Sequence, residues 1–422
     1  MRTTWRLLRR HRDLRLVLGA GLVSLTGDQL LAVGLAYYVY ALTGSTAVSA
    51  ATWLTLYLPS IALSSLAGVF VDRWDRLRTM VIANLLLAAG LLPLLAVHDR
   101  GDVWIVYLVT TWEGVVALFF SPAERAMVPR LVPDEDLVAA NAVNGQVRDV
   151  SRLVGAAVGG VVVAAGGIKA VTLVDVGTFV VAVALLVGVR TSGAVAAEAV
   201  DTHAGRLGGV RAEWSEGVRA VTSHPVLRVV ALFTLVAMTG EGVMGTLFAP
   251  FVRDVLHGSG TDFGVVVAVQ AVGGIVGGLA AVTVGQRLTP RAMFGAGAIV
   301  FGLVDLALFL YPLGYVAVWP AIALMVVVGL PGAVLMAGYA TLVQRSTTDA
   351  FRGRVSGALD TVVGIGVVTG SVLAGLLGDS VGIIPVLSAQ GAAYVLAGVL
   401  VLISLRRVPA AAGPPPGTPV PT

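Results

Sequence analysis

Two acidic residues lie in the middle of long apolar stretches and end the same four-residue pattern. Residues 25–28 read LTGD and residues 238–241 read MTGE, an offset of 213 (238 − 25). A carboxylate at membrane depth costs about 3 kcal/mol on insertion scales, so such a residue is a functional candidate. A carboxyl group in a low dielectric keeps its proton more readily, which suits Asp28 and Glu241 to exchange protons or to bind a cationic substrate. The repeat predicts two related halves that each place one acid near a shared central site, as in many secondary transporters.

The composition indicates a polytopic α-helical membrane protein. Of the 422 residues, 57% are hydrophobic and 12% are charged, about half the charged share of a soluble domain. The apolar runs are continuous over about 20 residues, which favours membrane helices over the alternating strands of a barrel. The chain has no cysteine, no P-loop motif and no metal-ligand or nucleophile constellation. We therefore expect no cofactor, no metal and no enzymatic activity.

The apolar runs predict twelve membrane helices in two pseudo-symmetric six-helix halves. The expected spans are 14-41, 47-71, 79-97, 103-130, 138-165, 169-190, 226-253, 262-285, 292-311, 316-344, 353-379 and 384-405. The first half is expected at 1-190 and the second at 226-407. A cytoplasmic linker at 191-225 joins them, either with a short amphipathic helix or as a plain solvated segment. The Pro-rich stretch 408-422 is expected to be a disordered cytoplasmic tail.

The basic residues predict the orientation. With the N-terminus in the cytoplasm, only Arg100, Lys169 and Arg253 fall on the far side, so 25 of the 28 basic residues (28 − 3) lie in or beside cytoplasmic segments. This bias satisfies the positive-inside rule. It predicts a multi-pass protein of the cytoplasmic membrane with both termini in the cytoplasm. The net charge of +4 sits in these loops and does not indicate nucleic-acid binding.

A charged motif separates the second and third expected spans. Residues 68–78 read GVFVDRWDRLR and resemble the signature G-x-x-x-D-R-x-G-R-R of the major facilitator superfamily, at the loop where that family carries it. Gly68 would allow close helix approach, and Asp72 would face the positive end of a helix in the other half. Arg73 and Arg76 would pair with acids such as Glu124. The resemblance implies a cytoplasmic gate; the alternative is an ordinary positive-inside loop.

The motif departs from the family pattern at two positions, where Asp75 replaces a glycine and Leu77 a basic residue. Other segments are similar to the branch of twelve-span drug:proton antiporters that includes macrolide-efflux proteins and the enterobactin exporter. They are residues 24–28 (SLTGD), 121–123 (SPA), 128–133 (VPRLVP), 139–142 (AANA), 175–179 (DVGTF) and 351–355 (FRGRV). Residues 155–160 (GAAVGG) resemble an antiporter motif ending in G-P-x-x-G-G, with Ala156 at the proline. Close packing by small residues explains that segment equally well.

The superfamily fold implies roles for several residues. Its spans 1, 4, 7 and 10 line the central cavity, which makes Asp28, Glu113 and Glu241 the candidate proton or substrate acids. Asp175 and Asp305 fall on peripheral spans, where a structural hydrogen-bonding role is expected. Aromatic residues near the acids are candidates for an apolar drug pocket, although bundle packing or lipid contact would also explain them. They are Tyr37, Trp112, Phe120, Phe248 and Tyr339.

The resemblance implies a monomeric secondary exporter of small amphipathic compounds, driven by proton antiport with alternating access. Its partners would be a small-molecule substrate, protons and the lipid bilayer, with no nucleic acid. Two alternatives share the same fold: a dedicated exporter of an endogenous siderophore or natural product, and a lipid flippase. An alternative of another class is a membrane sensor or enzyme that transports nothing.

Overall fold

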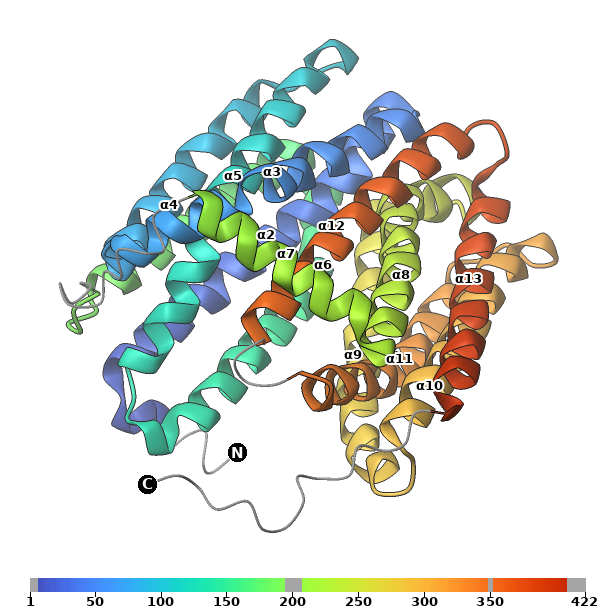
Figure 1. The fold of residues 1–422 in the computed structure, drawn as a ribbon. Helices are drawn as coiled ribbons and strands as arrows, with labels where there is room; N and C mark the ends of the chain where they lie inside the picture. The colour runs from blue at the N-terminus through green and yellow to red at the C-terminus, as the bar shows by residue number, and fades with distance from the viewer. Residues whose placement is uncertain (1–6, 194–206, 348–351, 408–422) are drawn as a thin grey trace.

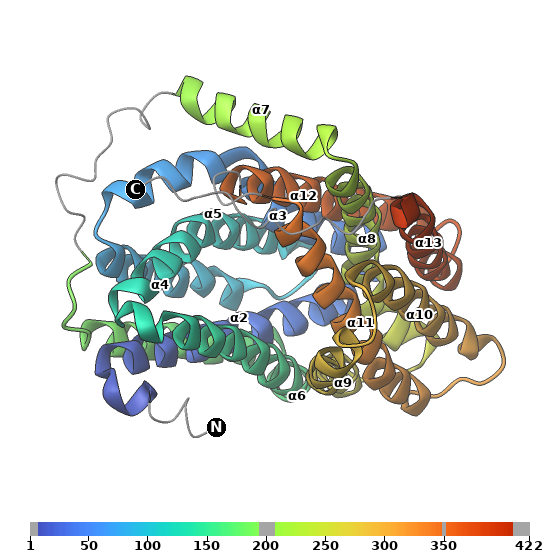
Figure 2. The same cartoon turned by 60° about the horizontal axis from the view of Figure 1, so that its bottom comes forward.

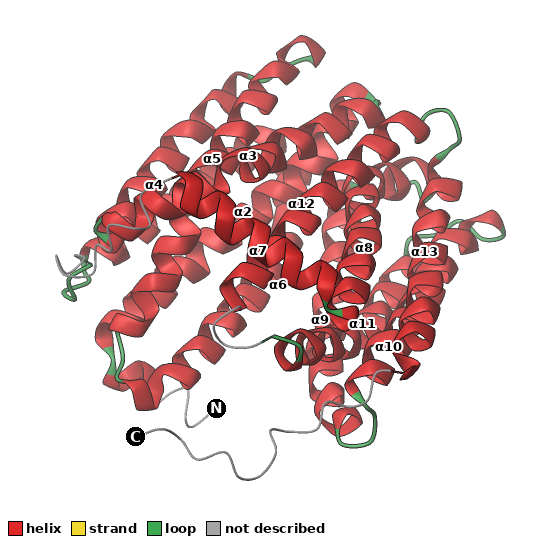
Figure 3. Ribbon diagram, in the orientation of Figure 1, coloured by secondary structure: helices red, strands yellow, loops and turns green. Residues whose placement is uncertain are grey.

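The computed structural model describes residues 7–193, 207–347 and 352–407, apart from the side chains of 60–62, 64–73, 138, 149, 207–214, 282, 352 and 353. Within these ranges the protein is helical and contains no strand (Figure 3). Figure 1 shows the helices of the first half (α2–α6) on one side of the molecule and those of the second half (α8–α13) on the other.

The helices follow the chain in an order close to the predicted one. The first half contains α2 (Arg12–Thr43), α3 (Thr46–Arg73), α4 (Arg76–Leu91), η1 (Leu92–Ala96), η2 (Arg100–Asp102), α5 (Val103–Met127), η3 (Val128–Arg130) and α6 (Asp134–Val187). After α7 (Leu207–Ser223), the second half contains α8 (Pro225–Pro250), η5 (Phe251–Val255), α9 (Gly260–Gly285), α10 (Pro290–Leu310), η6 (Tyr311–Leu313), α11 (Trp319–Arg345), α12 (Arg352–Leu377), α13 (Ile383–Ser404) and η8 (Leu405–Arg407).

The structure agrees with twelve membrane passes. Ten segments of the described chain are long and apolar enough to cross a bilayer. One of them, α6, has 54 residues and would be about 80 Å long if straight, more than twice a hydrocarbon core. It turns at Gly167, where φ is 60° and ψ is −157°, so it makes two passes. The 28-residue helix α3, which is not among the ten, is also long enough to cross and completes the twelve.

The two halves pack their helices in equivalent ways. In the first half α2 contacts α6, α3 contacts α5, and α4 contacts both α5 and α6. In the second half α8 contacts α12 and α13, α9 contacts α11, and α10 contacts both α11 and α13. Because each pair in one half has its counterpart in the other, the prediction of two pseudo-symmetric six-helix halves is confirmed.

Two helix pairs join the halves through small residues. A Cβ added at Gly160 of α6 would lie 2.6 Å from the Cα of Gly264 in α9, so these backbones touch. A Cβ added at Gly375 of α12 would lie 2.7 Å from the Cβ of Ala50 in α3. The two glycines are 215 residues apart (375 − 160) and lie in α6 and α12, which pack equivalently against α2 and α8, so equivalent positions of the two halves make both contacts. Figure 2 shows α6 beside α9 and α3 beside α12.

Hydrogen bonds close the two halves at one end of the bundle. The Tyr40 hydroxyl at the end of α2 donates to Asp254 in η5, and Arg253 Nη1 donates to the Tyr40 carbonyl over 3.2 Å. The Tyr37 hydroxyl donates to the Gly258 carbonyl over 3.4 Å. These contacts join the first half to the segment between α8 and α9, so this end separates only if they break.

The linker between the halves contains the helix α7, which runs along the outside of the bundle (Figure 2). Glu216 of α7 forms a 2.7 Å ion pair with Arg354 at the start of α12. The helical alternative for this part of the linker is therefore confirmed, whereas residues 194–206 lie outside the described chain. The expected tail at 408-422 also lies outside it.

Candidate functional site

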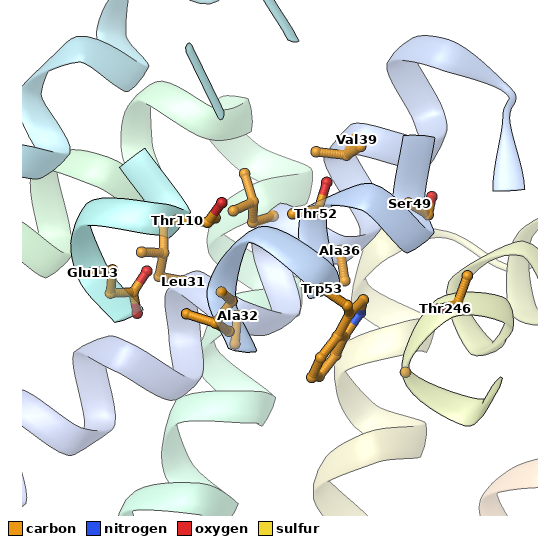
Figure 4. A pocket seen from close by; sticks show the side chains of 13 residues that line it. Leu31, Ala32, Ala36, Val39, Ser49, Thr52, Trp53, Thr110, Glu113 and Thr246 are labelled. Atoms are coloured by element: carbon orange, nitrogen blue, oxygen red, sulfur yellow. The ribbon is translucent and has the colours of Figure 1, made fainter. Parts of the chain in front are cut away.

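A pocket lies between the two halves, with about 540 Å³ of empty space including its part open to solvent. Three helices of the first half and α8 of the second surround it, with side chains that are mainly aliphatic or hydroxyl-bearing. They are Leu31, Ala32, Leu35, Ala36, Val39, Ser49, Thr52, Trp53, Leu56, Thr110, Glu113, Gly245 and Thr246. Figure 4 shows Trp53 between Glu113 and Thr246. An apolar pocket with one acid and several hydroxyl groups suits a small amphipathic ligand.

The three predicted acids lie in or beside this pocket. Glu113 of α5 lines it directly. Asp28 is half-buried and precedes the pocket-lining Leu31 and Ala32 by one helical turn on the same face of α2. Glu241 is exposed and precedes the pocket-lining Gly245 by one turn of α8. The structure therefore places Glu113 in the pocket wall and the other two acids one turn from wall residues of their helices.

Glu113 and Asp28 also belong to a local group of acids in the first half. Asp28 and Glu113 interact electrostatically, and each of them also interacts with Asp175 of α6, so their negative charges would repel one another. Asp175 has 0% exposure and accepts a 2.9 Å hydrogen bond from the Thr178 hydroxyl. In the second half, Glu241 interacts electrostatically with Asp305 of α10, which is 3% exposed. Each half therefore holds a buried acid that interacts with a candidate proton acid of the same half.

None of the five aromatic residues predicted for a drug pocket is among the residues that line this pocket. Trp112 turns toward α4, where its indole nitrogen donates to the Leu86 carbonyl over 2.9 Å. Phe248 is 4% exposed and packs in a core cluster that contains residues of both halves. Tyr339 is near the Thr234 hydroxyl, at 3.4 Å. Contacts with neighbouring helices therefore account for these three side chains.

The other two aromatic residues of that prediction are also packed elsewhere. Phe120 packs against the cores of the first half. Tyr37 lies at the closed end, where its ring centroid is 6.0 Å from that of Phe263. Packing explains both positions, which is the alternative that the sequence left open.

Sequence reasoning missed the contribution of α3. Ser49, Thr52, Trp53 and Leu56 of this helix line the pocket, and the Trp53 ring stacks on Tyr57 at 5.7 Å. The spacing 49, 52, 53, 56 marks one helical face. Two hydroxyl residues on the same face as a tryptophan in an apolar span were the signal that could have revealed it.

The predicted cytoplasmic gate is only partly described. Glu124 is 2% exposed and forms a 2.5 Å ion pair with Arg148 of α6, an arginine outside the loop motif. Arg76 begins α4, and its backbone N–H donates to the Gly193 carbonyl over 3.1 Å. The side chains of Asp72 and Arg73 lie outside the described residues, as does the environment of Gly68. The gate therefore stays a prediction.

Asp75, the departure from the family motif, has a local role. It is the N-cap of α4, and its carboxylate accepts a 2.9 Å hydrogen bond from the backbone N–H of Arg78. Such a cap satisfies one of the free N–H groups at the start of a helix. The residue therefore helps to begin the third span directly after the loop.

Comparisons with known proteins agree with this architecture. The chain matches the family model described as transmembrane secretion effector over residues 3–414. It is 28% identical over 407 residues to the multidrug efflux pump Tap of Mycolicibacterium fortuitum, which covers 93% of this chain and 96% of that protein. It is 30% identical over 156 residues to macrolide efflux protein A of Streptococcus pyogenes, covering 36% of this chain and 38% of that protein.

Solved structures show the same fold. A bacterial homologue of the iron transporter ferroportin in an inward-facing state aligns with a TM-score of 0.75 at 15% identity, over 94% of this chain and 99% of that one. The predicted all-α membrane fold and the predicted family are confirmed. The chain belongs to the transmembrane secretion effector family of the major facilitator superfamily and is a multi-pass membrane transporter, not an enzyme.

Proposed function

We propose that this protein exports small amphipathic, drug-like compounds from the cytoplasm in exchange for protons. The observation that carries the proposal is an apolar pocket between the two halves with Glu113 in its wall. Asp28 and Glu241 lie one helical turn from wall residues of α2 and α8, which supports a shared role for the three acids. The multidrug and macrolide efflux proteins that the chain resembles support drug-like compounds as the substrate class.

The exchange follows from competition for the acids. A carboxylate beside the pocket binds either a proton or the cationic group of a substrate. A proton that binds to the acid from outside would therefore displace a cationic substrate outward. Release of that proton to the cytoplasm would leave the acid charged and ready to bind the next substrate. Alternating access ensures that the two ligands reach the acids from opposite sides.

The orientation follows from the basic loops. With both termini in the cytoplasm, the end closed by Tyr40 and Asp254 faces outward, and breaking this contact is the step that releases substrate. The protein would function as a monomer in the cytoplasmic membrane, with protons and the bilayer as its other partners.

Transport in inverted membrane vesicles tests the proposal. With an imposed pH gradient, acid inside, we expect accumulation of ethidium or a macrolide, and collapse of the accumulation when a proton ionophore is added. A screen with labelled siderophores and labelled phospholipids covers the alternative substrates. Accumulation that is indifferent to the pH gradient would reject proton exchange, and accumulation of phospholipid alone would reject the substrate class.

A further inference from the structure

Asp175 is a buried acid of α6 that lies against the helix carrying Asp28. Its carboxyl is fully buried at the contact between α6 and α2. A side chain at Gly27 would overlap with the Asp175 Oδ1 atom and the Thr178 hydroxyl, so Asp175 is pressed against the backbone next to Asp28. The glycine at position 27 is therefore what allows Asp175 to pack against α2 one residue before Asp28.

One oxygen of this carboxyl lacks a partner. Oδ1 accepts from Thr178, whereas Oδ2 is buried with no hydrogen-bond partner among the described residues. Within that part of the chain, the charged groups that act on Asp175 are Asp28 of α2 and Glu113 of α5, and both are acids. A buried carboxylate without a cation and with one hydroxyl donor is costly, so the neutral, protonated carboxyl is the form that fits this site.

The second half provides an internal comparison. Offset 215 takes Asp175 to Gln390 (175 + 215), and Gln390 packs against Gly240 as Asp175 packs against Gly27: a Cβ at Gly240 would lie 2.8 Å from the Gln390 Cγ. An uncharged amide is therefore sufficient for packing at this repeat position. Only the first half carries a group there that can bind and release a proton.

We propose that Asp175 is a second proton-holding acid of the transport cycle, which exchanges its proton with Asp28 across the contact at Gly27. The proton passes from one carboxyl oxygen to the other, so that one group becomes the carboxylic acid as the other becomes the carboxylate. Asp175 then stores a proton out of reach of the substrate, while Asp28 is free to face the pocket. This inference rests on the proposed proton exchange and adds a residue to it.

Infrared difference spectroscopy of the purified protein tests the inference without transport. Spectra at high and low pH are compared for wild type and for Asp175→Asn, which gives the first half the neutral amide found at position 390. We expect the variant to lose the signal of one protonated carboxyl, and Asp175→Glu to restore it. Asp175→Gln serves as the second neutral variant if Asp175→Asn does not fold. An unchanged carboxyl signal in the folded neutral variant would overturn the inference.

The transport arm uses proteoliposomes and counts protons moved per substrate. We expect a lower proton count for the neutral variant, with downhill substrate exchange retained, and the wild-type count for Asp305→Asn as the matched buried acid of the other half. A wild-type count in the neutral variant would contradict the inference. If wild type itself moves no protons, the proposed function fails, and the infrared result still decides whether Asp175 holds an exchangeable proton.

Discussion

Gly155 of α6 lies against the backbone carbonyl of Thr26 in α2, and its repeat partner makes the same contact in the other half. There Gly370 of α12 lies against the carbonyl of Thr239 in α8. Thr26 and Thr239 belong to the two four-residue patterns that end in Asp28 and Glu241. The glycines therefore position the helices that carry both candidate acids, and close packing is a sufficient reason for the glycine-rich segment of α6.

We predict that Gly155→Ala and Gly370→Ala destabilise the protein by about 1–3 kcal/mol, because the added methyl group overpacks the backbone contact. Gly177 of α6 and Gly357 of α12 are matched controls, since no heavy atom lies within 4 Å of a Cβ added there. Alanine at these controls is expected to be neutral or slightly stabilising. Thermal unfolding in detergent measures the difference, and equal midpoints for contact and control variants would contradict the packing argument.

The closed end gives a second prediction. Tyr40→Phe removes the hydroxyl that donates to Asp254 and leaves the ring in place, so it should raise the population of molecules opened at this end. Because the chain has no cysteine, spin labels will attach only at the two cysteines that are introduced. Trp104→Cys and Leu313→Cys suit this purpose because both side chains are more than half exposed.

Double electron–electron resonance between these labels should show an added longer distance in Tyr40→Phe that is weak or absent with Tyr40 intact. Thr43→Val, which loses hydrogen bonds to the Val39 carbonyl and from the Ser45 N–H but none to the other half, is the control. Identical distance distributions in all three proteins would show that the Tyr40 contact does not hold this end closed.

The loop motif yields a prediction that separates two neighbouring acids. Asp75→Ala removes the N-cap of α4 and should cost about 1 kcal/mol of stability, whereas Asp75→Gly, the family residue, should cost only a few tenths of a kcal/mol.

Asp72→Asn should instead slow transport while equilibrium substrate binding is retained, because the predicted gate is far from the pocket. Unfolding midpoints and transport rates at matched protein levels distinguish the two. A loss of binding in folded Asp72→Asn would contradict the gate.

The pocket wall on α3 leads to a fourth prediction. Trp53 packs against Gly245 of the opposite half, where an added Cβ would lie 2.8 Å from its ring. Trp53→Ala should weaken transport of large aromatic substrates at least tenfold, because a stacking surface of the pocket is lost. Trp104→Ala, on an exposed face, is the control. Substrate competition assays measure the effect, and equal inhibition constants for wild type and Trp53→Ala would exclude this wall from the binding site.

The sequence predicted the fold in detail, because its signals are local and strong. Apolar runs of membrane length gave the twelve spans, and the repeated glycines and acids gave the two halves. The shared role of the three acids stays a prediction, although Glu113 lines the pocket. A charged group in an apolar span has few stable positions, so its place in the helix order nearly determines its environment.

The pocket could not be predicted in the same way. Trp112 adjoins Glu113 in sequence, yet its indole nitrogen bonds to α4, and Phe248, seven residues after Glu241, is buried in a core cluster. Which face of a helix meets which neighbour depends on helix rotation and on contacts distant in sequence, such as Trp53 with Gly245. The packing contact between Asp175 and Gly27 was missed for the same reason, since the two residues lie on different helices.

Gradient-driven export by the paired variant Asp28→Asn, Glu241→Gln tests the central claim most directly. The amides keep the size of the acids but cannot exchange protons, so the pocket should still form. In inverted vesicles with an imposed pH gradient and matched protein levels, we expect uphill accumulation of substrate to be abolished and downhill exchange to survive. Asp305→Asn should accumulate substrate like wild type. Full gradient-driven accumulation by the paired variant would contradict the account.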